Sequence, residues 1–187
     1  MIPRNQIAPR EIDSNVSAFC ERLCIESTPI FVPVVPEPGA KHLECHPNVD
    51  AKVKIAGGRN VYGWQISESP GIFLEAQFHS IWESPTGEFL DISPEELGHT
   101  KILFLPDPHR SYNGTRVPLE RHALGDPQIV ERYCELLESS SRIFQDLISK
   151  GFRVGDPVFH SQIGPLMTEI MSIRQKLQPV ESGRNGD

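Results

Sequence analysis

Three residues of this chain, Cys45, His79 and Asp91, have the types that together carry out nucleophilic catalysis. Cys45 lies two residues before Pro47, and proline suits the first turn of a helix. At a helix N-terminus the unsatisfied backbone N–H groups favour the thiolate form of a cysteine. We therefore expect Cys45 to be the nucleophile, His79 to be the general base and then the acid, and Asp91 to orient the imidazole.

The hairpin that we expect between residues 72–83 and 88–92 brings His79 close to Asp91. The turn sequence Ser-Pro-Thr-Gly at 84–87 separates these two strand-like runs. A turn centred in this sequence pairs His79 with a position one residue away from Asp91. The two side chains are therefore predicted to lie side by side on neighbouring strands.

The order of the three residues resembles that of the papain-like and transglutaminase-like cysteine hydrolase superfamily. The matching segments are 44–49, 78–82 and 90–94, and the resemblance covers about residues 41–105. It implies an amidase, deamidase or peptidase, or an acyl transferase, that works through a thioacyl intermediate. The partner is then a substrate with an amide or thioester group, protein side chains included. We expect no cofactor and no metal.

The sequence departs from papain-type enzymes in one respect. Those enzymes supply an oxyanion-hole glutamine a few residues before the cysteine, and residues 36–44 contain none. Backbone N–H groups near Cys45 and His46 are one alternative source of this stabilisation, and the side chains of Gln77 or Gln65 are another.

Substrate contacts are expected from residues in the strands around His79, namely Trp64, Gln77 and Trp82. The two indole rings can line a cleft beside the nucleophile. Packing of aromatic rings in the core is the alternative for at least one of them.

Two alternatives to catalysis remain open at this point. His42, Cys45 and His46 form a cluster of zinc-binding types, which would make the protein a zinc-binding structural domain. A pair of C-terminal helices can instead serve a non-enzymatic interaction protein as its oligomerisation or partner-binding face. A cysteine at a helix start is also often a small buried hydrophobe.

Hydrophobic periodicity predicts an α+β protein with an antiparallel sheet, the Cys45 helix packed on it and two C-terminal helices. We expect helices over residues 14–27, 47–56, 127–150 and 163–177. We expect strands over residues 30–35 (at a sheet edge), 60–67, 72–83, 88–92 and 101–105. A turn-rich excursion without regular structure is predicted for residues 106–126.

Length, charge and cysteine usage limit the class of protein. The 187 residues predict a single domain over 11–178, with its core at 41–105, a helical part at 126–178 and flexible tails at 1–10 and 179–187. A net charge of −7 argues against a nucleic-acid partner. The apolar runs are too short to span a membrane, and the N-terminus has no apolar signal core. We therefore expect a cytoplasmic protein with four reduced cysteines.

Overall fold

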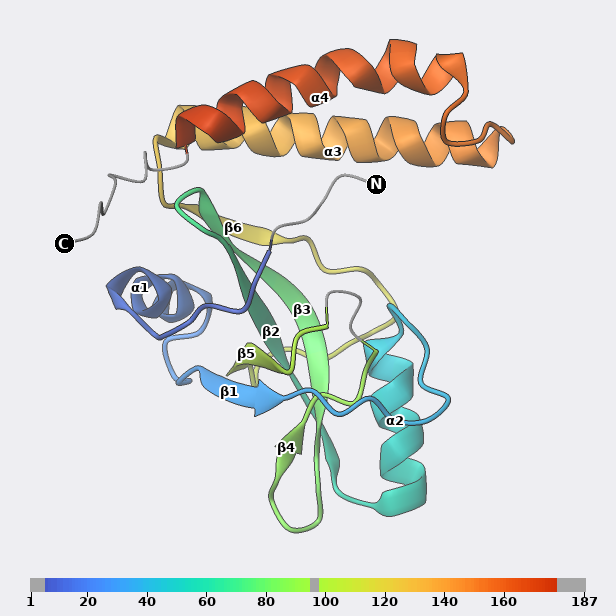
Figure 1. The fold of residues 1–187 in the computed structure, drawn as a ribbon. Helices are drawn as coiled ribbons and strands as arrows, with labels where there is room; N and C mark the ends of the chain where they lie inside the picture. The colour runs from blue at the N-terminus through green and yellow to red at the C-terminus, as the bar shows by residue number, and fades with distance from the viewer. Residues whose placement is uncertain (1–5, 95–97, 178–187) are drawn as a thin grey trace, which may run out of the picture. The chain divides into compact units, whose positions relative to one another are not determined.

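The chain folds as an α+β protein, and the computed structural model describes residues 6–94 and 98–177 (Figure 1). Within these residues the helices are α1 (Ser14–Leu23), α2 (Cys45–Ala56), α3 (Pro127–Ser149) and α4 (Pro157–Leu177). The strands are β1 (Ile30–Pro33), β2 (Arg59–Ser69), β3 (Phe73–Glu83), β4 (Phe89–Leu90), β5 (Lys101–Pro106) and β6 (Glu120–Ala123). The expected fold class, an antiparallel sheet with the Cys45 helix and two C-terminal helices, is confirmed.

The chain divides into two compact units by its internal contacts. The sheet unit contains residues 6–69 and 74–122. The helical unit contains the tip of the β2–β3 hairpin at 70–73 and residues 123–177. All the residues predicted to do chemistry belong to the sheet unit.

The sheet closes on itself because its two end strands meet. Its strand order is β1-β5-β2-β3-β4, and β6 pairs with β3 outside this path. Beyond the end of β1, Val35 N–H donates to Asp91 O at 2.8 Å, and Asp91 N–H donates to Pro33 O at 3.0 Å. These backbone bonds join the segment after β4 to the segment after β1. Asp91 is thereby held at the seam of the sheet.

A cluster of fully buried apolar residues from three strands supports this closed sheet. Its members are Val32, Ile81, Ile102 and Phe104. Where β2 pairs with β5, Gly63 lies so close to the Leu105 carbonyl that any Cβ would overlap it. The glycine is therefore required for the close approach of these two strands.

Helix α1 and the N-terminal segment differ from what the sequence predicts. Asp13 caps α1 through its side chain, and the helix ends at Leu23 rather than near 27, because Cys24 adopts extended backbone angles. Residues around Ile7, expected to lie in a flexible tail, pair with β2. Ile7 N–H donates to Glu68 O at 2.9 Å, and Glu68 N–H donates to Ile7 O at 2.8 Å. The expected tails at 1–5 and 179–187 lie outside the described residues.

The excursion at 106–126 contains a strand that the sequence analysis did not predict. Strand β6 has the sequence Glu-Arg-His-Ala, which lacks an apolar alternation. Its pairing with β3 is supported by Arg121, whose Nε lies 2.7 Å from Glu75 Oε2. The strand is specified by this contact with a distant part of the chain.

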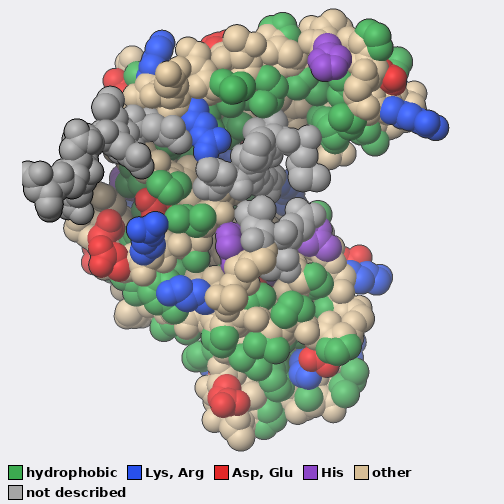
Figure 2. Space-filling model, viewed as in Figure 1, with side chains coloured by type: hydrophobic (Ala, Val, Ile, Leu, Met, Phe, Trp, Pro, Cys, Tyr) green, Lys and Arg blue, Asp and Glu red, His purple; other side chains and the backbone are tan. Residues whose placement is uncertain are grey.

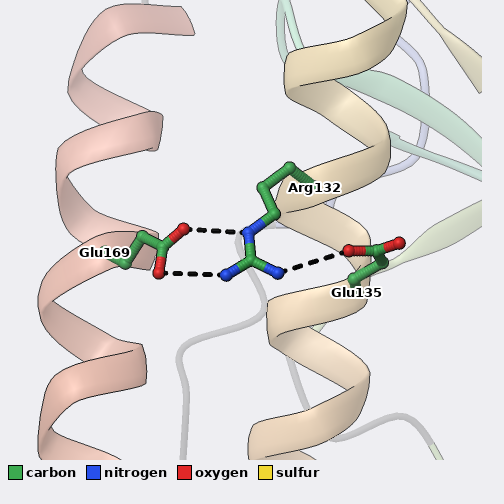
Figure 3. Close-up of polar contacts among 3 residues, drawn as sticks. All are labelled: Arg132, Glu135 and Glu169. Carbon is green, nitrogen blue, oxygen red and sulfur yellow. Dashed lines mark hydrogen bonds and ion pairs between the residues drawn. The ribbon is translucent and has the colours of Figure 1, made fainter.

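The helical unit is an αα pair with its own core. Helix α4 begins at Pro157, six residues earlier than expected, and it carries Pro165 inside. Tyr133, Leu136, Ile170 and Ile173 are among the buried residues between α3 and α4. On the surface of the pair, Arg132 binds both carboxylate oxygens of Glu169 and one of Glu135 (Figure 3).

Candidate active site

Helix α2 begins at Cys45, two residues before the expected start at Pro47, so the thiol lies at the helix N-terminus as expected. Its N-cap residue, Glu44, makes no side-chain hydrogen bond to the first turn. The preceding residue, Leu43, has φ of 62° in the left-handed region, which costs a non-glycine residue about 1–2 kcal/mol. Asn48 holds this turn, because its side chain accepts from Lys41 N–H at 2.9 Å and donates to Lys41 O at 2.8 Å. A braced and strained turn therefore sets the place of the thiol.

On the edge of β3 away from β2, the middle residues lie between the pairings with β4 and β6. The start of α2 lies beside these residues, since His46 contacts Ser80. Toward its end β3 pairs with β4 through Trp82 and Glu83. Toward its beginning β6 lies alongside, since Leu124 N–H, just after β6, donates to Ile72 O at 2.9 Å. His79 and Ser80 fall between these two pairings. Successive residues of a strand point to opposite faces, so they can meet the start of α2 from both sides of the sheet.

Asp91 lies near His79, although not in the register expected. The hairpin pairs Trp82 with Leu90 and Glu83 with Phe89, which places Asp91 opposite Ile81 and leaves His79 two residues along. The two side chains are therefore diagonal neighbours on one face. His79 Nε2 lies 3.1 Å from Asp91 Oδ2, and both side chains are buried. The register differs by one residue from the expected one, and this difference places the two side chains on the same face of the sheet.

The contact between His79 and Asp91 is an ion pair and not an aligned hydrogen bond. Among the described residues, Nε2 of His79 has no hydrogen-bond partner of good geometry despite its nearness to Oδ2. The other carboxylate oxygen, Oδ1, accepts from Ser93 N–H at 3.0 Å. Because Nε2 faces the carboxylate, Nδ1 is the ring nitrogen left for the thiol of Cys45.

Burial and charge act in opposite directions on the pKa values of His79 and Cys45. Burial would lower the pKa of His79, but the Asp91 carboxylate and the Cys45 thiolate raise it from 6.5 to about 10. Burial would raise the pKa of Cys45, but hydrogen bonding and charge from His46 and His79 lower it from 9.0 to about 5. Near neutral pH the pair is therefore a thiolate and an imidazolium.

His46 is a part of the site that the triad prediction did not include. Its Nδ1 lies 3.0 Å from Ser80 Oγ. Its ring stacks on Tyr112 with centroids 4.0 Å apart, and Tyr62 and Phe78 lie within 6 Å of it. The sequence did place His46 beside Cys45, but as a zinc ligand. Its packing against Tyr112 depends on the fold of the distant excursion.

The three residues expected to contact substrate differ in their exposure. Trp64 is 1% exposed, and its Nε1–H donates to Asp107 Oδ2 at 3.0 Å. Trp82 is also buried, and its Nε1–H donates to Gly57 O at 2.9 Å. Both indoles have satisfied donors and pack in the core, whereas Gln77 is exposed on β3. Of the three, Gln77 has a side chain that solvent reaches freely.

The other cysteines lie in different surroundings from Cys45. All four cysteines are thiols and not disulfides, and Cys20, Cys24 and Cys134 are buried. Burial raises the pKa of Cys20 to about 11. Among residues 6–94 and 98–177, no group of three or more His, Cys, Asp or Glu side chains is placed to hold a metal ion. The zinc cluster suggested by His42, Cys45 and His46 is thus not assembled in this part of the chain.

Comparisons with protein-family models, with curated proteins and with solved structures gave no match. In the part of the chain that is described, none of the helices is long and apolar enough to cross a lipid bilayer. The function therefore has to be argued from the chemistry of the site.

Proposed function

We propose that this protein is a cysteine-dependent hydrolase or acyl transferase of the papain-like and transglutaminase-like type, acting through Cys45, His79 and Asp91. The observation that carries the proposal is the buried pair of His79 and Asp91, with Nε2 and Oδ2 3.1 Å apart, beside the thiol that begins α2. The lowered pKa of Cys45 and the raised pKa of His79 agree with this geometry. A strained backbone beside Cys45 adds to it. Such perturbed groups are typical of catalytic sites.

The first chemical step is attack of the Cys45 thiolate on the carbonyl carbon of an amide or thioester. The S–C bond forms, and the electron pair of the C=O bond moves to the oxygen. When the tetrahedral species collapses, the bond to the amine or thiol leaving group breaks, and that group takes the proton from His79 Nδ1. A thioacyl enzyme and a neutral imidazole remain.

The second step releases the acyl group and restores the ion pair. Water or an amine loses a proton to His79 Nδ1 and attacks the thioester carbon. The S–C bond then breaks and Cys45 leaves as the thiolate. Asp91 stabilises the imidazolium whenever it forms, and the backbone bonds of Asp91 to the segment after β1 keep the carboxylate in place. No cofactor takes part in either step.

An apolar surface near the site supports a peptide or protein as the substrate. Hydrophobic side chains gather in the lower part of the view in Figure 2, where Figure 1 places β1, β4 and α2. The exposed apolar side chains in and around β1 and α2 are Phe31, Val35, Leu43 and Ile55. Leu43 is 79% exposed and stands two residues from the nucleophile. A thiolate nucleophile also has to stay reduced, which favours a cytoplasmic location.

The test is the pH dependence of alkylation at each cysteine by iodoacetamide, read by peptide mass spectrometry between pH 4 and 10. We expect Cys45 to react with a midpoint near pH 5 and to outpace the three buried thiols, which serve as internal controls. 4-Nitrophenyl acetate should then acetylate Cys45, and the Cys45→Ala variant should lose both reactions. A Cys45 midpoint near 9, or no acetylation, contradicts the proposal.

The helical unit supports a second candidate, an interaction protein that needs no chemistry. Four apolar side chains on and beside its helices are exposed: Ile148, Phe152, Val154 and Met171. If this unit mediates assembly, Val154→Glu should lower the mass measured by light scattering and leave the alkylation rate of Cys45 unchanged. An unchanged monomeric mass in both proteins removes self-assembly from consideration.

A further inference from the structure

A second imidazole is fixed beside the Cys45 thiol. His46 follows Cys45 in the first turn of α2, and its side chain is 8% exposed. Ser80 Oγ, in a residue with no exposed surface, lies 3.0 Å from Nδ1. Tyr112 covers the ring by stacking at 4.0 Å with an interplanar angle of 17°. The ring therefore has a buried polar contact on one nitrogen and an aromatic neighbour on one face, which together restrict its orientation.

This arrangement favours one tautomer of His46. Since Nδ1 is occupied by Ser80, Nε2 is the nitrogen left to face the thiol, with which His46 hydrogen-bonds. A lone pair on Nε2 beside a thiolate would be repelled, so the proton belongs on Nε2. Nδ1 then accepts from the Ser80 hydroxyl. In this arrangement His46 presents its Nε2–H donor to the nucleophile.

We propose that His46 Nε2–H stabilises the oxyanion that forms when Cys45 attacks a carbonyl, in place of the glutamine that this site lacks. The inference rests on the proposed function. In the resting enzyme the donor faces the sulfur. As the S–C bond forms, negative charge moves from sulfur to the carbonyl oxygen beside it. His46 Nε2–H then donates to that oxygen.

The start of α2 supplies the second donor of this oxyanion site. The backbone N–H of Cys45 lies in the uncapped first turn, since the Glu44 side chain makes no cap hydrogen bond there. Pro47 has no N–H to offer. A backbone N–H and an imidazole N–H on consecutive residues thus make a two-donor site, and the exposed Gln77 is not needed for it.

The test compares two reactions of the same thiol at pH 7.5. 4-Nitrophenyl acetate acylates Cys45 through an oxyanion, whereas iodoacetamide alkylates it by displacing iodide and forms no oxyanion. We expect His46→Leu to lower the ratio of acylation to alkylation rates by roughly 10–100-fold. His46→Gln, which keeps an N–H donor, should restore most of the ratio. Ser80→Ala should lower it by a smaller factor, because the tautomer is no longer fixed.

The exposed His109, whose Nε2 contacts Glu26, provides the matched control, and His109→Leu should leave the ratio unchanged. If His46 only maintains the thiolate, both rates fall together in His46→Leu, and the unchanged ratio overturns the inference. Should His46→Leu not fold by circular dichroism, an unchanged ratio in Ser80→Ala overturns it instead. A wild-type Cys45 that is alkylated but never acylated refutes the proposed function, and this inference falls with it.

Discussion

The pKa values of two cysteines in the sheet unit are shifted in opposite directions, upward for Cys20 and downward for Cys45. Cys20 lies inside α1 next to buried apolar residues such as Val16 and Phe19, and burial raises its pKa to about 11. Cys45 begins α2, and burial acts on it in the same direction. The imidazoles of His46 and His79 nevertheless lower its pKa to about 5.

The difference shows that charged and hydrogen-bonding neighbours, and not burial alone, set the pKa of a thiol. A buried thiol without such neighbours stays protonated at neutral pH and behaves as a small apolar side chain. In the proposed active site the same residue type has a lowered pKa, because β3 supplies an imidazole and the segment after β4 supplies a carboxylate. Three measurements separate these contributions.

Removing the imidazole of His79 should have the largest effect on the difference in pKa between Cys45 and Cys20. In His79→Ala the Cys45 thiolate loses its cationic partner, so the pKa of the thiol rises toward its ordinary value. Alkylation of Cys45 by iodoacetamide at pH 6 should fall on the order of 100-fold, while the rate at pH 9 changes much less. Cys20 should keep its slow rate. If the Cys45 midpoint does not move, His79 is not the partner of the thiol.

Replacing Asp91 by Asn should have an intermediate effect. The amide keeps the shape of the side chain but removes the negative charge 3.1 Å from His79 Nε2, so the pKa of His79 falls. The imidazolium then supports the thiolate less well, and alkylation of Cys45 at pH 6 should slow by about tenfold.

The backbone bonds of residue 91 to Pro33 and Val35 do not depend on its side chain. Asp91→Asn should therefore keep the fold, which circular dichroism can verify. An alkylation profile identical to wild type would limit Asp91 to its role in closing the sheet.

The smallest effect is expected in the pH dependence of stability. The pKa of Cys45 is lowered from 9.0 to about 5, so its stabilising contribution is lost as the pH falls through 5. The pKa of His79 is raised from 6.5 to about 10, so its contribution is lost as the pH rises through 10. For the pair together, the free energy of unfolding should rise from pH 5 to 6.5, stay level to pH 9 and fall toward pH 10.

Urea unfolding of wild type and Cys45→Ala measures this contribution. The rise between pH 5 and 6.5 should be absent in Cys45→Ala. Cys20→Ser is the matched control. An unpaired hydroxyl at this buried position should lower stability by about 1–3 kcal/mol without changing the shape of the profile between pH 5 and 9. Above pH 9 the raised pKa of Cys20 adds to the fall of the wild type, so the comparison is made below that pH. A wild-type profile that is flat between pH 5 and 6.5 would argue against the ion pair.

The sequence by itself determined the elements that local signals specify. Pro47 indicated the start of the helix that carries Cys45, and the glycines at 57 and 58 indicated its end. The turn at 84–87 indicated the hairpin that brings His79 and Asp91 together. Turn and helix-end residues act on their own backbone, so their meaning does not depend on the rest of the fold. For this reason the types and order of the candidate nucleophile, base and carboxylate could be proposed from the sequence.

Only the tertiary structure decided what depends on contacts between distant residues. These features include the polar strand β6, the seam that holds Asp91, and the diagonal register of His79 with Asp91. The burial of Trp64, the hydrogen bond of Ser80 to His46 and the stacking of Tyr112 on His46 also depend on distant residues. Each is stabilised by a partner 30 or more positions away or by a one-residue choice of register. Local periodicity carries no information about such pairings, because the energy that selects them arises only when the whole sheet has closed.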